Sequence, residues 1–168
     1  MFLRLLDFLF PRLSLSGTEG YWMTAQELRA MYTSPIRMER GELRRAGIKY
    51  LDRLVAASTY ESSPMLRLAI RRFKYGRMPR LSTALAGLLV RALPLLPVSQ
   101  QTVFTSVPLH WSRRFARGFN QSQLLVDELS AVRGLCVQQL LRRVRPTGHQ
   151  AWRSRRERAR LCSARAAR

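Results

Sequence analysis

The chain has 168 residues, enough for one domain with a small appended piece, and its 46% hydrophobic content permits a buried core and argues against general disorder. Thirty basic and ten acidic residues give a net charge of +20 at pH 7. Two cysteines, Cys136 and Cys162, stand outside any CxxC spacing, which excludes a disulfide framework and a four-cysteine zinc site and fits a reduced, cytoplasmic setting.

The basic residues are almost all arginine, since only Lys49 and Lys74 are lysines. The planar guanidinium group can bind a phosphate through two hydrogen bonds, and so high a net charge favours attraction to nucleic acid. A G+C-rich genome would raise the arginine content as well. The excess therefore supports an anionic partner without identifying it.

The first third of the chain is expected to contain several helices. Residues 2–10 predict an amphipathic helix that ends at Pro11, and no small-residue cleavage pattern of a signal peptide follows it. The polar, arginine-rich segment after it has weak periodicity. It predicts a short helix near 25–31 and a longer amphipathic helix near 42–57.

From Ser63 on, the elements alternate between helix and strand. Ser63 can cap the N-terminus of a helix with Pro64 at its first position, and Gly76 ends that helix. The hydrophobic pattern predicts, in order, two helices, a strand, a third helix and a second strand, over 64–75, 81–93, 102–108, 118–132 and 135–141. This alternation predicts an α/β fold with a parallel sheet.

The most apolar stretch of the chain does not fit a membrane span, and the most basic stretch has too few apolar residues to form a core by itself. Residues 81–98 contain Arg91 and two prolines, and a span there would place a charge in the middle of the bilayer. The tail from Arg142 onward holds ten arginines and a single acid, Glu157. We expect a solvated helix or a flexible arm there.

A basic segment between the first strand and the third helix is the main candidate site. In open α/β sheets, ligands bind beyond the carboxyl ends of the strands, where helix N-termini offer free N–H groups. We therefore expect residues 109–117 to form a loop that holds phosphate or pyrophosphate, with a glycine for close approach and amides at the first helical turn. The candidate ligands are Arg113, Arg114, Arg117, Gly118, Asn120 and Gln121. A surface loop with solvated arginines is the alternative.

Aromatic side chains interleave with the cations, which is typical of proteins that bind single-stranded nucleic acid. We expect Phe73 and Phe119 to be core residues. Trp111, Phe115 and Trp152 are candidates for exposed stacking platforms, and Lys74 is a candidate phosphate contact. His110 lies in the same segment, but no acid is near it in sequence, and we interpret it as a surface residue.

The segment "VPLHWSRRFARGFNQS", above all its pentapeptide RGFNQ, resembles the signature of the ComF family. Tyr60 to Gly76 is similar to the family's tyrosine, apolar helix and Lys-Tyr-x-Gly turn. The tail "RVRPTGHQAWRSRRERAR" also resembles the family pattern, at Arg143 or Arg145, Gln150 and Arg158, which we carry over as nucleic-acid contacts. The similarity covers nearly the whole chain and is most specific over 60–123.

The resemblance implies a type I phosphoribosyltransferase-like fold behind an N-terminal four-cysteine zinc module, and a role in handling single-stranded DNA during natural transformation. It implies two domains here, 1–59 and 60–168, with residues 109–117 as the loop that contacts the pyrophosphate end of phosphoribosyl pyrophosphate. Competence DNA-processing proteins are the implied partners.

Two departures from the family pattern limit what is carried over. Ser14 and Ser16 stand where the family has cysteines, so we expect no metal site and a degenerate N-terminal region. The paired-aspartate motif that holds the ribose is absent, so we expect a truncated member with an incomplete parallel sheet. We expect no cofactor, with magnesium only if the phosphoribosyl site is completed elsewhere.

Three functions remain open on the sequence. The first is a binding module for single-stranded DNA or a phosphorylated nucleotide. The second is a phosphoribosyltransferase that uses phosphoribosyl pyrophosphate, which the missing aspartates argue against. The third is a non-functional truncated remnant. No catalytic residue can be named.

Overall fold

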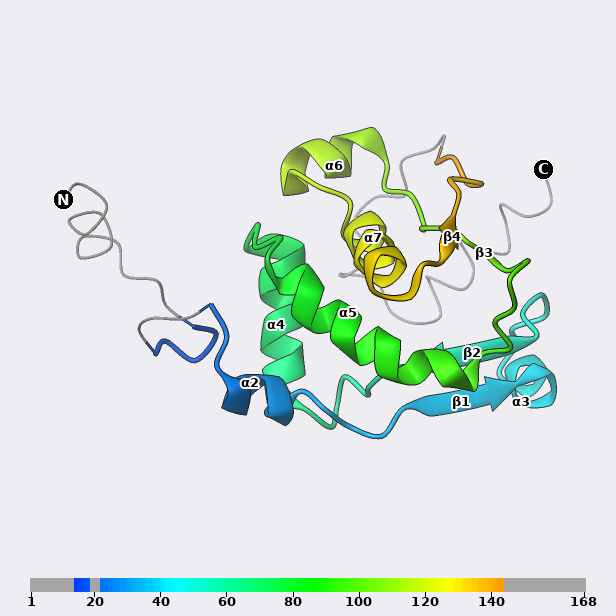
Figure 1. The fold of residues 1–168 in the computed structure, drawn as a ribbon, viewed down its shortest axis with the longest axis horizontal. Coiled ribbons are helices and arrows are strands. Elements are labelled where there is room, and N and C mark those ends of the chain that lie inside the picture. Colours follow the sequence, from blue (N-terminus) through cyan, green and yellow to red (C-terminus); the bar gives the residue numbers. More distant parts are fainter. Residues whose placement is uncertain (1–13, 19–21, 144–168) are drawn as a thin grey trace.

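The computed structural model describes residues 14–18 and 22–143 and has a mixed α/β architecture with two small sheets (Figure 1). The predicted helix at 2–10 lies outside the described residues. The elements, in chain order, are α2 (Ala25–Ala30), β1 (Ile36–Glu39), α3 (Arg40–Arg45), β2 (Arg53–Ala56), α4 (Pro64–Tyr75), α5 (Leu81–Ala92), the 3-10 helix η1 (Leu93–Leu95), β3 (Val103–Phe104), α6 (Trp111–Arg117), α7 (Gln121–Arg133) and β4 (Cys136–Val137).

The N-terminal region forms a helix and an antiparallel hairpin. Helix α2 confirms the short helix predicted near 25–31. The longer helix predicted over 42–57 is wrong, because α3 ends at Arg45 and Gly47 then adopts a left-handed φ of 83°. The rest of that segment contains β2, which pairs with β1 from Ile36↔Ala56 to Glu39↔Arg53. Pairing with a strand elsewhere in the chain therefore decides its conformation.

A buried carboxylate organises the segment where the resemblance expects cysteines. Glu27 is 4% exposed, and its Oε1 accepts hydrogen bonds from the Ser14 hydroxyl at 2.8 Å and the Ser16 N–H at 2.5 Å. Its Oε2 accepts the Thr24 N–H at 2.7 Å, which completes a capping box at the start of α2. This segment is therefore held by hydrogen bonds as well as by packing.

Helices α4 and α5 supply most of the hydrophobic core. Ser63 caps α4 as predicted: its hydroxyl accepts the Leu66 N–H at 3.0 Å and donates to the Ala30 carbonyl at 2.7 Å, and Gly76 ends the helix. Phe73 is buried as predicted. The core also takes in two residues from the N-terminal region, Leu15 and Met31, beside Leu66, Ala69, Phe73, Leu81, Leu85 and Leu88.

The second sheet is a parallel pair, as the alternating pattern predicted. Val103 pairs with Cys136 and Phe104 with Val137, and α6 and α7 connect the two strands. Both strands are shorter than predicted, at two residues each, although the Gln138 N–H still donates to the Phe104 carbonyl at 2.9 Å. Helix α7 packs along α5 and lies between α6 and β4 (Figure 1). The coarse α/β prediction is confirmed by this arrangement.

Helix α5 contains most of the apolar stretch 81–98. Its N-terminus is fixed by Glu128 of α7, whose Oε1 accepts hydrogen bonds from Ser82 Oγ and Thr83 Oγ1, each at 2.8 Å. Among the described residues, no helix is long enough and apolar enough to cross a membrane.

Candidate functional site

The segment predicted as a phosphate-binding loop is a helix. Residues 111–117 form α6, so the loop predicted over 109–117 is wrong for most of its length. Between Pro108 and Gly118 the sequence contains no glycine or proline, so nothing in it prevents a helical turn. Gly118 ends the helix with a left-handed φ of 82°. The glycine thus serves as a helix cap, and no bound group is needed to explain it.

Helix α6 sorts its arginines onto two sides. Arg113 and Arg117, four residues apart, share a side and are half-buried, whereas Arg114 is exposed. Arg117 Nη1 donates to Gln121 Oε1 at 3.2 Å, and its guanidinium lies 5.3 Å from the centre of the Tyr75 ring. Arg113 Nη2 is buried without a hydrogen-bond partner among the described residues. The three arginines among the predicted phosphate ligands therefore do not form one cradle.

The amides after Gly118 have different roles from one another. Asn120 caps α7, and its side-chain oxygen accepts the Ser122 N–H at 3.2 Å, so it stabilises the helix start that we had expected to bind an anion. Gln121 is 6% exposed. Arg117 donates a hydrogen bond to the Oε1 of Gln121. The Nε2 of Gln121 is buried and has no hydrogen-bond partner within the described part of the chain.

Lys74, on α4, lies near Arg117 and shares a cavity with Gln121. Partial burial lowers the pKa of Lys74, and the Arg117 guanidinium lowers it further. The cavity has a volume of about 340 Å³ and lies between the end of β2 and helices α4, α5 and α7. The fold thus brings together Lys74, Arg117 and Gln121, which the sequence assigned to two different sites.

Three exposed residues of α6 lie on its outer side, and we call them the exposed face of α6: Trp111, Arg114 and Phe115. Trp111 is 74% exposed and Phe115 is 87% exposed, as predicted for stacking platforms. The spacing of three and four residues places both rings and the Arg114 guanidinium on one side of the helix. This is the combination of flat apolar rings and cation that binds the bases and phosphates of single-stranded nucleic acid.

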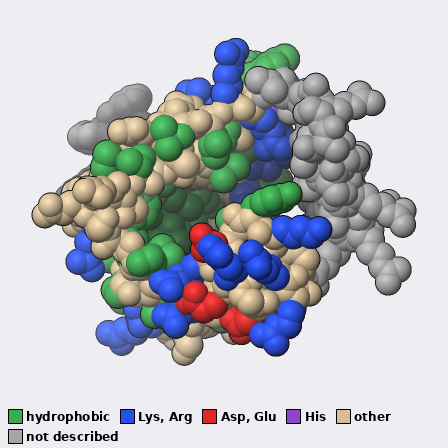
Figure 2. All heavy atoms as spheres, turned by 90° about the vertical axis from the view of Figure 1, so that its right-hand side faces the viewer, with side chains coloured by type: hydrophobic (Ala, Val, Ile, Leu, Met, Phe, Trp, Pro, Cys, Tyr) green, Lys and Arg blue, Asp and Glu red, His purple; other side chains and the backbone are tan. Residues whose placement is uncertain are grey.

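The arginines of α6 differ from those at the opposite end of the molecule in their partners. On the hairpin and α3, Glu39 Oε1 lies 3.1 Å from Arg37 Nε and 2.9 Å from Arg53 Nε, and Arg40 Nε donates to Asp52 at 2.7 Å. Figure 2 shows acidic and basic side chains side by side on that face, next to a hollow with hydrophobic walls. Within residues 14–18 and 22–143, by contrast, no arginine of α6 forms a salt bridge.

Two side chains next to α6 hold it in place. Arg77, which has a positive φ of 50°, donates from Nε and Nη2 to the Ala116 carbonyl at 3.3 and 2.9 Å. His110 is 8% exposed, so our interpretation of it as a surface residue is wrong. Its Nδ1 lies 2.8 Å from Ser112 Oγ, and its ring packs against Trp111 at a centroid distance of 5.5 Å. Sequence patterns gave no sign of either role, since both contacts depend on the turn before α6.

Of the predicted tail contacts, only Arg143 lies among the described residues. Its Nη1 donates to the Pro108 carbonyl at 3.4 Å, beside the start of α6. The other predicted nucleic-acid contacts, Arg145, Gln150, Trp152 and Arg158, lie outside the described residues. In the described part of the chain, no three His, Cys, Asp or Glu side chains gather into a group that could hold a metal.

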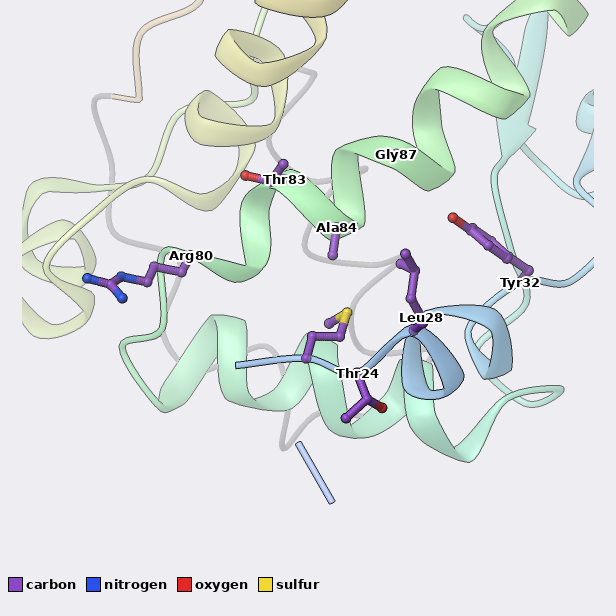
Figure 3. A pocket seen from close by; sticks show the side chains of 9 residues that line it. Thr24, Leu28, Tyr32, Arg80, Thr83, Ala84 and Gly87 are labelled. Carbon is purple, nitrogen blue, oxygen red and sulfur yellow. The ribbon is translucent and has the colours of Figure 1, made fainter. Parts of the chain in front are cut away.

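A second cavity, of about 480 Å³, lies between α2 and α5 (Figure 3). Leu28 and Tyr32 extend from the α2 segment toward α5, whereas Arg80 extends away from the cavity (Figure 3). The Arg80 guanidinium lies 4.9 Å from the Trp22 ring, and that of Arg91 lies 4.2 Å from the Tyr32 ring. Both cations are therefore engaged in stacking between α5 and the N-terminal region, and this cavity offers a ligand mainly apolar walls.

The fold and the site define an α/β protein with a basic, aromatic helix face. Two curated proteins of Salmonella, both named DNA utilization protein YhgH, are similar to it. The Salmonella typhi protein is 40% identical over 107 residues, and that of Salmonella typhimurium (strain LT2) is 39% identical over 107 residues. In both comparisons the match covers 59% of this chain and 45% of the relative, so the chain spans less than half the length of these relatives. No family model and no solved structure matches the chain.

Proposed function

We propose that the chain binds single-stranded DNA through the exposed face of α6 and serves in the use of DNA taken up by the cell, as a ComF-like protein of the cytoplasm. The observation that carries the proposal is the pair of exposed rings, Trp111 and Phe115, beside Arg114, a cation that forms no salt bridge with any described residue. Bases stack on such rings while phosphates bind the cation.

Three further observations support the proposal. The net charge of +20 attracts a polyanion, and no acidic side chain among the described residues forms a salt bridge with an arginine of α6. The motif RGFNQ, which carries the resemblance to the ComF family, forms the junction between α6 and α7. The similar Salmonella proteins are named for DNA utilization. Competence DNA-processing proteins are the partners that this role implies.

The proposed fold is of the phosphoribosyltransferase type. The parallel pair β3 and β4, with α6 and α7 between the strands, supports this assignment because it is a βαβ unit of the kind from which such sheets are built. In this proposal, the surface after β3 that would otherwise contact a pyrophosphate instead binds the DNA backbone. Transfer of a phosphoribosyl group is not part of the proposal.

The experiment is a fluorescence anisotropy titration of a labelled oligothymidylate at several salt concentrations. The double variant Trp111→Ala and Phe115→Ala should lose at least about thirtyfold in affinity at every salt concentration, because it removes two stacking rings and each stacked base contributes about 1–3 kcal/mol. Arg114→Ala should instead lower the slope of log K against log salt by about 0.7, since it removes one phosphate contact.

The matched control is Tyr50→Ala, which removes a ring that is 92% exposed in the connection between α3 and β2. These two elements lie away from α6 (Figure 1). This variant should bind the oligonucleotide as tightly as the unaltered protein. The proposal fails if the double variant of α6 binds with unchanged affinity, or if Tyr50→Ala weakens binding to the same extent.

A further inference from the structure

The cavity next to Lys74 has the features of a small-molecule site that is separate from the exposed face of α6. Its volume of about 340 Å³ lies at the lower end of the range of about 300–1,000 Å³ typical of ligand pockets. Most of its wall is apolar and comes from β2, α4, α5 and α7. The apolar lining includes Val55, Ile70, Phe73, Leu85, Leu88 and Leu125.

Two polar side chains at the wall, those of Lys74 and Gln121, are available to bind a ligand. Lys74 lines the cavity, is exposed at its mouth and forms no salt bridge within the described part of the chain, and partial burial lowers the pKa of its ammonium. Gln121 is only 6% exposed, and its buried Nε2 has no hydrogen-bond partner among the described residues. A buried donor without an acceptor is costly, and such groups in native proteins call for an explanation.

The orientation of the Gln121 amide is fixed by a neighbour. Arg117 Nη1 donates to its Oε1 at 3.2 Å, which assigns the remaining Nε2 as a donor. Arg117 itself is held over the Tyr75 ring, so its position does not depend on a ligand. The cavity lining therefore contains two side chains that can donate hydrogen bonds, one cation and one amide, and both favour an anionic acceptor.

From these features we infer that this cavity binds a small molecule that joins a flat ring to one anionic group. The ring would occupy the apolar part, between Phe73 and the leucines of α5, and the anionic group would accept hydrogen bonds from Lys74 Nζ and Gln121 Nε2. A ring-bearing phosphate and an aromatic carboxylate share this chemistry. Inorganic phosphate fills only the polar part, and a neutral ring only the apolar part.

The chain offers a direct test because it contains only two lysines. Reductive methylation with ¹³C-formaldehyde retains the positive charge of both ammonium groups and gives each a separate NMR signal. Lys49 precedes β2, outside the cavity lining, and is exposed, so its signal is an internal control. Titration with phenyl phosphate should shift the Lys74 signal along a saturating curve and leave that of Lys49 unchanged.

Further arms identify the ligand chemistry. Inorganic phosphate should bind at least tenfold more weakly than phenyl phosphate, because it buries no apolar surface. Thymidine 5′-monophosphate and benzoate separate the two sources: saturable binding of the first alone assigns a ring-bearing phosphate, and of the second alone an aromatic carboxylate. Calorimetry on unmethylated protein should show at least a tenfold loss for Lys74→Met and no loss for Lys49→Met.

The inference is overturned if phenyl phosphate shifts both lysine signals alike, or if inorganic phosphate binds as tightly as phenyl phosphate. This test is independent of DNA binding by α6. The double variant Trp111→Ala and Phe115→Ala should bind phenyl phosphate normally, since neither ring lines the cavity.

Discussion

The hydroxyl of Ser14 donates a 2.8 Å hydrogen bond to the buried carboxylate of Glu27, thirteen residues along the chain. The same carboxylate also accepts backbone N–H groups of Ser16 and Thr24. Ser14 and Ser16 stand where the resemblance to the ComF family expects cysteines. In this chain, one carboxylate thus connects a turn with the start of α2.

Replacing this carboxylate should destabilise the N-terminal region. Glu27→Gln cannot accept all of these hydrogen bonds, and it leaves at least one backbone N–H unsatisfied in a buried place. We expect a loss of about 1–3 kcal/mol in the free energy of unfolding, measured by urea denaturation. The matched control is Glu42→Gln, which alters the equivalent capping-box residue of α3 at an exposed position, and should cost less than about 0.5 kcal/mol. Equal losses in the two variants would show that burial at Glu27 has no particular effect.

Glu27 should also make the free energy of unfolding depend on pH. Burial acts to raise the pKa of Glu27, but the hydrogen bonds from Ser16, Thr24 and Ser14 outweigh it and lower that pKa from 4.5 to about 2. Because the folded-state pKa is depressed, the stabilisation is complete above about pH 4.5 and is lost as the pH falls toward 2. The difference in unfolding free energy between the unaltered protein and Glu27→Gln should therefore shrink over this interval. A difference that stays constant from pH 7 to pH 3 would contradict the assignment.

Glu128 should couple α7 to the start of α5. Its Oε1 accepts hydrogen bonds from Ser82 and Thr83, and α5 has no side-chain cap and no acidic residue in its first turn. Glu128→Gln should lower the unfolding free energy by about 1 kcal/mol, because it weakens both hydrogen bonds and removes a negative charge near a helix N-terminus. Asp127→Asn removes the neighbouring charge, which contacts only Gln123 four residues away among the described residues, and should have almost no effect. Urea denaturation of both variants compares the two.

Arg77 should control the local stability of α6 rather than that of the whole protein. Its two hydrogen bonds to the Ala116 carbonyl place a cation at the C-terminal end of the helix. In Arg77→Ala, hydrogen exchange of the α6 amides should accelerate by about fivefold, while exchange in α4 and α5 stays as it was. Arg71→Ala, an exposed arginine of α4, is the control and should leave α6 unchanged. Equal acceleration throughout the protein would show that Arg77 supports the core instead.

Local signals in the sequence were sufficient where a helix has its own caps. Ser63, Pro64 and Gly76 define α4, and Thr24 with Glu27 starts α2, because each cap lies within a few residues of the groups that it satisfies. The alternation of helix and strand likewise gave the parallel pairing of β3 with β4. Trp111 and Phe115 were candidates for exposure because aromatic and basic residues interleave there, and both rings are exposed.

Contacts between distant segments decided the rest. The sequence around Val55 is compatible with a helix, and only pairing with β1 makes it a strand. Nothing local shows that residues 111–117 coil into a helix that Arg77 anchors, or that Lys74 and Gln121 share one cavity. By itself, then, the sequence determined the caps, the element order and the excess of positive charge, since these depend on neighbours along the chain. Strand pairing and the composition of the site were decided by the tertiary structure, because both depend on groups that only packing brings together.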